Sequence, residues 1–291
     1  MLILKKWKTK NNSKFTLLKK DKKYLVLFFF VFLHMLYFKK IVNLSSNEWC
    51  VFIHGAGGSS AIWHKQVKAY AENFNVLLID LRGHGKSKEI KTTKNYSFQM
   101  IAEDVIEVVE YNKIEKAHFI GVSLGTIIIY QVFDLKPNLV KSMIFSGAIT
   151  RLNVKSRLLL RIGRILNPFL PYMTLYALLA RIIMPKKNHK KSRLLFINEA
   201  KKVMTHEFNR WFKLTARLTA YLNKVEHENN DKPTIYIMGS EDHMFLEPVK
   251  KIVNSNPKIS LNIVLNCGHV VNIEQAEIFN DISINFIRKL A

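Results

Sequence analysis

From Trp49 onward, short apolar runs alternate with segments of helical periodicity, and this alternation constrains the fold of the chain. Apolar residues recur at helical spacing in 62–71, 100–109 and 124–135. The runs between them have the length and composition of buried strands: Trp49–Ile53, Asn75–Ile79, Ala117–Ile120, Lys141–Phe145, Thr234–Met238 and Ile259–Leu265. Such alternation predicts an α/β fold whose mostly parallel sheet is covered by helices on both faces.

The alternation is interrupted over residues 151–223, a long basic segment of helical character that Pro168, Pro171 and Pro185 divide. Strand signals return only at Thr234. We therefore expect a helical cap over 151–223, inserted into a core that comprises 35–150 and 224–291.

The net charge of +23 is concentrated in two parts of the chain. Residues 1–34 hold nine lysines against Asp21, and residues 151–217 hold 16 basic against 2 acidic residues. Arg157, Arg161 and Arg164 would share one face of a helix in the cap. This basic face could be a solvated surface, could bind an anionic membrane, or could bind an acidic carrier protein. Nucleic acid is not expected as a partner, because no recognition fold accompanies the charge.

The first 34 residues have two interpretations. Basic residues precede an apolar run over 24–38, an order that resembles a signal anchor. As a helix, this run would span about 22 Å, less than the ~30 Å of a bilayer core. Alternatively, 1–34 is a dispensable extension, and the segment from Met35 opens the fold with a hairpin. We expect a cytoplasmic protein, either free or associated with a membrane through 24–38 or the basic cap. Cys50 and Cys267 are not expected to form a disulfide.

Gly121-Val122-Ser123-Leu124-Gly125 lies between a predicted strand and a predicted helix. Glycine two residues before and after a serine allows a sharp turn that exposes the hydroxyl as a nucleophile. A serine needs a histidine base, which in turn needs a carboxylate to orient it. Asp242 and His269 each follow a predicted strand, and the carboxyl ends of parallel strands are where functional residues gather.

Five segments in order resemble motifs of the α/β-hydrolase superfamily, in particular its serine esterases with a cap: HGAGGSSAIW, DLRGHGKS, GVSLG, GSEDHMF and CGHVVNIE. The resemblance extends over about residues 35–291. It implies that Ser123 is the nucleophile, His269 the general base and Asp242 its orienting acid. It also implies an oxyanion hole formed by the backbone N–H groups of Ala56 and Leu124. A serine at this position excludes the dehalogenases and epoxide hydrolases of this fold, which use aspartate.

We therefore predict an enzyme that cleaves a small-molecule carboxylic ester with an apolar or lipid-like acyl group. The same residues would also suit thioester hydrolysis, acyl transfer, perhydrolysis or C–C bond hydrolysis, and a non-catalytic binding protein on this scaffold is a further alternative. Neither a cofactor nor a metal site is expected, because the histidines are scattered without ligand spacing.

Several other residues have structural interpretations. Glu241 competes with Asp242 for the role of the acid, whereas His54, His84 and Trp63 are expected to support the loops beside the site. Two departures from the superfamily pattern, Gly125-Thr126 and Glu274-Gln275-Ala276, are expected to affect helix packing more than activity.

Overall fold

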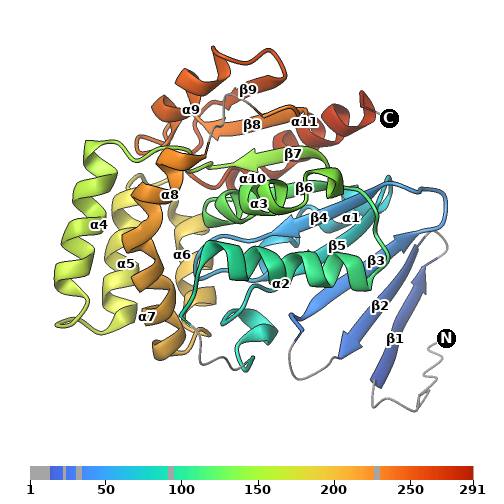
Figure 1. Ribbon diagram of the computed structural model, residues 1–291, viewed down its shortest axis with the longest axis horizontal. Coiled ribbons are helices and arrows are strands. Elements are labelled where there is room, and N and C mark those ends of the chain that lie inside the picture. The colour runs from blue at the N-terminus through green and yellow to red at the C-terminus, as the bar shows by residue number, and fades with distance from the viewer. Residues whose placement is uncertain (1–13, 22–23, 31–34, 91–94, 226–229, 291) are drawn as a thin grey trace.

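The computed structural model of the chain describes residues 14–21, 24–30, 35–90, 95–225 and 230–290. Its described strands form one sheet in the order β1-β2-β3-β5-β4-β6-β7-β8-β9 (Figure 1). The strands from β5 to β9 in this order are mutually parallel, whereas β1, β2 and β3 run antiparallel to their neighbours. Their bounds are β1 Lys14–Asp21, β2 Tyr24–Phe30, β3 Phe38–Asn43, β4 Trp49–Ile53, β5 Asn75–Ile79, β6 Ala117–Val122, β7 Val140–Ser146, β8 Thr234–Gly239 and β9 Ile259–Val264.

The predicted α/β class and mostly parallel sheet are confirmed, and each predicted strand coincides with an observed one within two residues. All five residues of β5 and all six of β6 are buried. Strands covered on both faces consist of continuous apolar runs, and for this reason they were recognisable in the sequence.

Helices cover both faces of this sheet, as Figure 1 shows. On one face, α2 Phe98–Tyr111, α3 Leu124–Leu135 and α9 Leu246–Val253 pack over a core that includes Val51, Phe119 and Tyr236. On the other face, α1 Val67–Ala71 and α11 Ala276–Arg288 pack over a core that includes Phe52 and Ile120. Shorter elements are α10 Val271–Glu274 and the 3-10 turns η1 Ser60–Trp63, η2 Gly85–Ser87, η3 Pro137–Leu139 and η4 Thr215–Arg217.

Two local predictions were wrong. The segment after Met35 does not open the fold with a hairpin, because β3 and β4 both pair with β5, which lies between them. The helix predicted over 62–71 is also divided into η1 and α1. Here the chain turns so that Trp63 and Gln66 are both fully buried. The Gln66 side chain donates to the Asn272 carbonyl oxygen, 2.9 Å away.

Parts of the N-terminal 34 residues continue the sheet. β2 pairs with β3, and β1 pairs with β2, so both add antiparallel strands at one edge. In the structure, 24–30 therefore forms a strand and not the helix that a membrane anchor requires. The remainder of the predicted anchor or extension, 1–13, 22–23 and 31–34, lies outside the described residues. Among the described helices, none has the length and apolar character needed to cross a bilayer.

Between β7 and β8 the described residues form five α-helices, over nearly the same segment for which the cap was predicted. They are α4 Val154–Leu166, α5 Tyr172–Ile183, α6 Lys190–Ala200, α7 Thr205–Leu214 and α8 Leu218–Lys224. Figure 1 shows them grouped beside the sheet, with α4 outermost. They lie near the ends of β6, β8 and β9 from which Ser123, Asp242 and His269 follow, and this arrangement creates a covered site.

Candidate active site

Ser123 occupies a strained turn between β6 and α3. Its backbone has φ 53° and ψ −120°, outside the regions that L-residues ordinarily adopt. The glycines on either side permit this turn. A Cβ on Gly125 would lie 2.3 Å from the Ile53 carbonyl oxygen, and one on Gly121 would lie 3.1 Å from the backbone of Gly125. The turn thus raises the hydroxyl above the sheet.

The structure brings Ser123, His269 and Asp242 into one hydrogen-bonded chain. His269 Nε2 lies 3.0 Å from Ser123 Oγ, and His269 Nδ1 lies 2.8 Å from Asp242 Oδ2. Asp242 is 1% exposed and His269 5% exposed, so water screens neither partner well. Asp242 Oδ1 also accepts from the Phe245 N–H at 3.2 Å, and the Phe245 ring packs against the imidazole. These contacts hold the imidazole between a hydroxyl and a carboxylate.

Ala56 and Leu124 line the same cavity as Ser123. Leu124 is the first residue of α3, where backbone N–H groups have no partner within the helix. Ala56 lies in the loop after β4, and its carbonyl oxygen accepts from Tyr176 Oη of α5 at 2.9 Å. Ala56 and Leu124 thus come from separate segments to the same cavity, and their N–H groups remain the predicted oxyanion donors.

Two buried histidines shape the loop that carries Ala56. His54 Nε2 accepts from the Leu81 N–H at 2.9 Å, and His84 Nε2 accepts from the Gly57 N–H at 3.0 Å. Burial lowers the pKa of His54 to about 4. Burial, together with the neighbouring His54, lowers the pKa of His84 to about 3. Both rings are therefore neutral near pH 7 and can accept these hydrogen bonds.

The cavity beside Ser123 encloses about 220 Å³ and is lined chiefly by apolar side chains from the cap. Leu159 and Leu160 come from α4, Leu179 and Ile183 from α5, and Phe212 from α7. Ser123 and His269 lie in its wall. The cap therefore supplies most of the surface that a bound molecule would contact.

Sequence reasoning missed two side chains that support this geometry. Thr126 Oγ1 donates to the Ser123 carbonyl oxygen at 2.6 Å and accepts from the Ile149 N–H at 3.3 Å. Glu274 Oε2 accepts from the N–H of Gly268, the residue before His269, at 2.7 Å. Thr126 and Glu274 both stand in segments where the sequence departs from the superfamily pattern. Those departures were the one sequence feature that could have indicated their roles.

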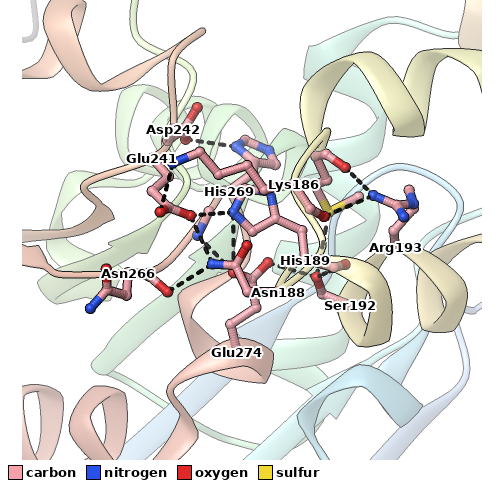
Figure 2. Close-up of polar contacts among 12 residues, drawn as sticks. Lys186, Asn188, His189, Ser192, Arg193, Glu241, Asp242, Asn266, His269 and Glu274 are labelled. Atoms are coloured by element: carbon pink, nitrogen blue, oxygen red, sulfur yellow. Dashed lines mark hydrogen bonds and ion pairs between the residues drawn. The ribbon is translucent and has the colours of Figure 1, made fainter.

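Glu241 faces away from the imidazole and binds the cap (Figure 2). Its carboxylate lies 2.8 Å from Lys186 Nζ and 2.7 Å from His189 Nε2. Hydrogen bonds from Lys186 and Asn188 lower the pKa of Glu241 to about 2. The His189 side chain is completely buried. Of the two neighbouring acids, Asp242 thus contacts His269, and Glu241 connects the cap to the same loop.

The remaining predicted residues have structural positions. Trp63 is fully buried and packs edge-on against Phe52 at a centroid distance of 5.1 Å. Cys50 and Cys267 are both free and buried. Within the described ranges, no group of three or more His, Cys, Asp or Glu side chains could hold a metal ion.

Comparisons with known proteins agree with this architecture. Residues 49–179 match a family described as "alpha/beta hydrolase fold". A 3-oxoadipate enol-lactonase of Acinetobacter baylyi is 39% identical over 75 residues, which are 26% of this chain and 27% of the relative. A provisionally named esterase/lipase of Haemophilus influenzae is 24% identical over 82% of this chain and 83% of its own. The chain thus spans about a quarter of the first relative and most of the second.

Solved structures extend the likeness to nearly the whole fold. The enol-lactonase from Burkholderia xenovorans superposes with a TM-score of 0.72 at 18% identity, over 87% of this chain and 96% of that one. Residues 49–179 therefore match the α/β-hydrolase family, and the fold of the chain is the α/β-hydrolase fold, as predicted. The named relatives are hydrolytic enzymes, esterases and lactonases among them.

Proposed function

We propose that the protein is a serine hydrolase that cleaves a carboxylic ester through an acyl-enzyme. The observation that carries this proposal is the hydrogen-bonded chain from Ser123 through His269 to Asp242, at the wall of an apolar cavity. Residues in this order and contact provide a nucleophile, a base and an orienting acid.

In the proposed cycle, His269 Nε2 takes the proton of Ser123 as Oγ attacks the ester carbonyl carbon. The negative charge that develops on the carbonyl oxygen is stabilised by the N–H groups of Ala56 and Leu124, each donor contributing about 3 kcal/mol. His269 then protonates the departing alcohol, leaving an acyl group on Ser123. Water, activated by the same imidazole, releases the acid and restores the serine. Asp242 stabilises the imidazolium in both halves of the cycle.

The proposed substrate has an apolar acyl or alcohol portion of modest size. The leucine and isoleucine side chains of α4 and α5 that line the cavity offer few polar partners. The volume of about 220 Å³ is below the range of about 300–1,000 Å³ for sites that hold drug-sized ligands. Short and medium acyl chains should therefore be hydrolysed faster than long ones.

A fluorophosphonate probe, which reacts with activated serines, tests the proposal. Labelling of the full chain should be abolished by Ser123→Ala and retained in Ser45→Ala, which changes an exposed serine. A panel of p-nitrophenyl esters of graded length then measures turnover. Undiminished labelling of the Ser123→Ala variant would contradict the assignment of the nucleophile.

The same panel separates the other reactions that this geometry could perform. Turnover of thioesters would reveal thioester cleavage. Added alcohols would reveal acyl transfer, and added peroxide would reveal perhydrolysis, in each case through the share of acyl product formed with the added compound. A ketone substrate would reveal C–C bond hydrolysis. Probe labelling without turnover of any of these compounds would instead support a binding protein and contradict the hydrolase.

A further inference from the structure

Helix α4 carries apolar side chains on the face that points away from the rest of the molecule. Spacings of three and four residues align these side chains along one side of the helix and its C-terminal continuation. We call them the outer stripe: Val154, Leu158, Ile162, Ile165 and Phe169, with exposed fractions of 72%, 54%, 42%, 59% and 79%. Large apolar side chains exposed in one continuous row usually mark a contact surface.

Folding of the chain does not explain this stripe, because α4 already has an inner face. Leu159 and Leu160 line the cavity, Ser156 is buried, and Gly163 lies against the Phe212 ring. Figure 1 shows α4 at the outer edge of the cap, with α5 on its inner side. The helix is therefore apolar on both of these sides, but only the inner side is covered by the described part of the chain.

Positive charge follows the outer stripe. Arg157, Arg161 and Arg164 are exposed along one side of it, and Lys155 is exposed on the other. None of the three arginines forms an ion pair within the described ranges. Residues 151–198 contain no acidic side chain at all. An apolar stripe with basic flanks complements a surface that is apolar within and negatively charged at its boundary.

We propose that the outer stripe of α4 docks the protein on an anionic lipid bilayer. The helix lies in the plane of the interface, with Leu158 and Ile165 among the acyl chains and the arginines at the lipid phosphates. From Val154 to Phe169 the stripe is about 22 Å long, enough for a helix that rests on a membrane without crossing it. A second copy of the chain fits less well, since pairing two such helices would bring their arginine rows together.

Docking in this orientation places a wall of the cavity at the membrane. α4 presents Leu158 to the lipid and Leu159 and Leu160 to the cavity. A hydrophobic ester dissolved in the bilayer would then reach Ser123 by a short route past α4. This last step rests on the proposed function, whereas docking itself does not.

Cosedimentation of the full chain with lipid vesicles tests the docking. Vesicles of phosphatidylcholine with phosphatidylglycerol should bind the protein, and vesicles of phosphatidylcholine alone should bind it at least tenfold more weakly. The triple variant Arg157→Gln, Arg161→Gln, Arg164→Gln should reduce binding to the anionic vesicles by roughly a hundredfold, because each basic residue near such a surface strengthens binding about fivefold. The matched control is Lys68→Gln, Lys116→Gln, Lys251→Gln, which removes equal charge from exposed positions outside the cap and should change binding much less.

The apolar part of the surface is tested by Leu158→Ser with Ile165→Ser. This pair should weaken vesicle binding about tenfold or more, since two side chains no longer enter the lipid. Leu265→Ser, at a 73% exposed position after β9, is the control. Unchanged vesicle binding in both α4 variants would overturn the proposal and would assign binding to another basic segment. A dimer that the α4 variants abolish, without vesicle binding, would also overturn it.

Fluorophosphonate labelling in the absence of vesicles distinguishes the two proposals. The α4 variants should be labelled like the unchanged protein, because the substituted side chains do not line the cavity. Vesicle binding by Ser123→Ala at full strength would support docking even if the hydrolase assignment failed.

Discussion

At the scale of single residues, the turn at Ser123 depends on the absence of side chains at Gly121 and Gly125. The two positions are not equivalent. A Cβ at Gly125 meets the backbone oxygens of Ile53 and His54, at 2.3 and 2.8 Å, whereas the nearest contact at Gly121 is the end of the flexible Ile129 side chain at 2.6 Å. Backbone in a close-packed sheet can shift less than a side chain can.

We therefore predict that Gly125→Ala is the more damaging substitution. It should cost about 3 kcal/mol of unfolding free energy and most of the activity, because it displaces the loop that leads to Ala56. Gly121→Ala should cost about 1 kcal/mol. Urea denaturation and ester turnover measured side by side check the order. Equal losses in the two variants would mean that the contact with Ile53 and His54 does not decide the effect.

The buried rings of His54 and His84 predict a loss of stability in acid. Their pKa values of about 4 and about 3 lie below the ordinary histidine value of 6.5, mainly because of burial. At a pH between the lowered values and 6.5, these two histidines bind protons in the unfolded chain but not in the folded one. The free energy of unfolding therefore falls as the pH falls below about 6.5. At pH 5, each ring should remove about 2 kcal/mol of the stability present at pH 7.5.

Urea denaturation at both pH values measures this loss. His84→Gln preserves an acceptor for the Gly57 N–H but does not titrate, so the difference between the two pH values should shrink by about 2 kcal/mol. A difference as large as that of the unchanged protein would show that His84 is not the group responsible.

The three residues of the hydrogen-bonded chain could be predicted, whereas their supports could not. Ser123, Asp242 and His269 stand in recognisable segments at predicted strand ends. The contacts of Glu274 with Gly268 and of Tyr176 with Ala56 depend on how separate loops and helices meet. No local pattern in the sequence specifies such contacts.

At the scale of elements, the loop after β8 and the start of α6 are connected through Glu241 and His189 (Figure 2). His189 precedes α6, and its Nε2 also lies 4.0 Å from Glu274 Oε2. Glu241 belongs to the loop that carries Asp242, and Glu274 is the last residue of α10, the helix that follows His269. The cap thus contacts the site through a buried histidine as well as through the cavity wall.

We predict that His189→Ala weakens this connection at measurable cost. Glu241 loses a buried partner and Glu274 a neighbouring one, so the free energy of unfolding should fall by about 2 kcal/mol, and kcat should fall severalfold. Lys186→Met is a matched control, because it removes another partner of Glu241 that is 56% exposed. Exposed ion pairs contribute less than about 1 kcal/mol, so this variant should remain close to the unchanged protein. Equal effects of the two substitutions would show that burial at His189 has no special importance.

The positions of the strands in the sequence were predicted better than their pairing in the sheet. β5 and β6 are apolar throughout because helices cover both faces, and a continuous apolar run is visible in the sequence. The pairing of β3 with β5 joins segments separated by some thirty-five residues, and nothing near Phe38 indicates it. This is why an opening hairpin was predicted and why it was wrong.

At the scale of the whole molecule, the core and the cap contribute different parts of the candidate site. The core holds Ser123, Asp242 and His269 beyond the carboxyl ends of β6, β8 and β9, three parallel strands of one sheet. The cap encloses the space above them with apolar side chains. The sequence revealed the cap as a basic helical segment, but it did not show which helix faces line the cavity, because that depends on how α4, α5 and α7 pack together.

This division predicts that acyl-chain selectivity can be changed in the cap without changing the chemistry. Leu179 of α5 lines the cavity, whereas the adjacent Leu178 is 40% exposed and does not. Leu179→Trp should fill part of the 220 Å³ and lower kcat/KM for the longest ester that is turned over by about tenfold or more, since one methylene in a closed apolar pocket already changes the rate by about that factor. Rates with acetyl esters should change little, because Ser123 and His269 keep their positions.

The matched variant Leu178→Trp places the same ring one position along α5, on the outer side, and should leave the chain-length profile unchanged. For both variants, kcat/KM is measured with each p-nitrophenyl ester of the series. Parallel losses at every length in Leu179→Trp would indicate damage to the hydrogen-bonded chain instead of a smaller cavity. An identical profile in all three proteins would place the acyl group outside this cavity and contradict the proposed substrate pocket.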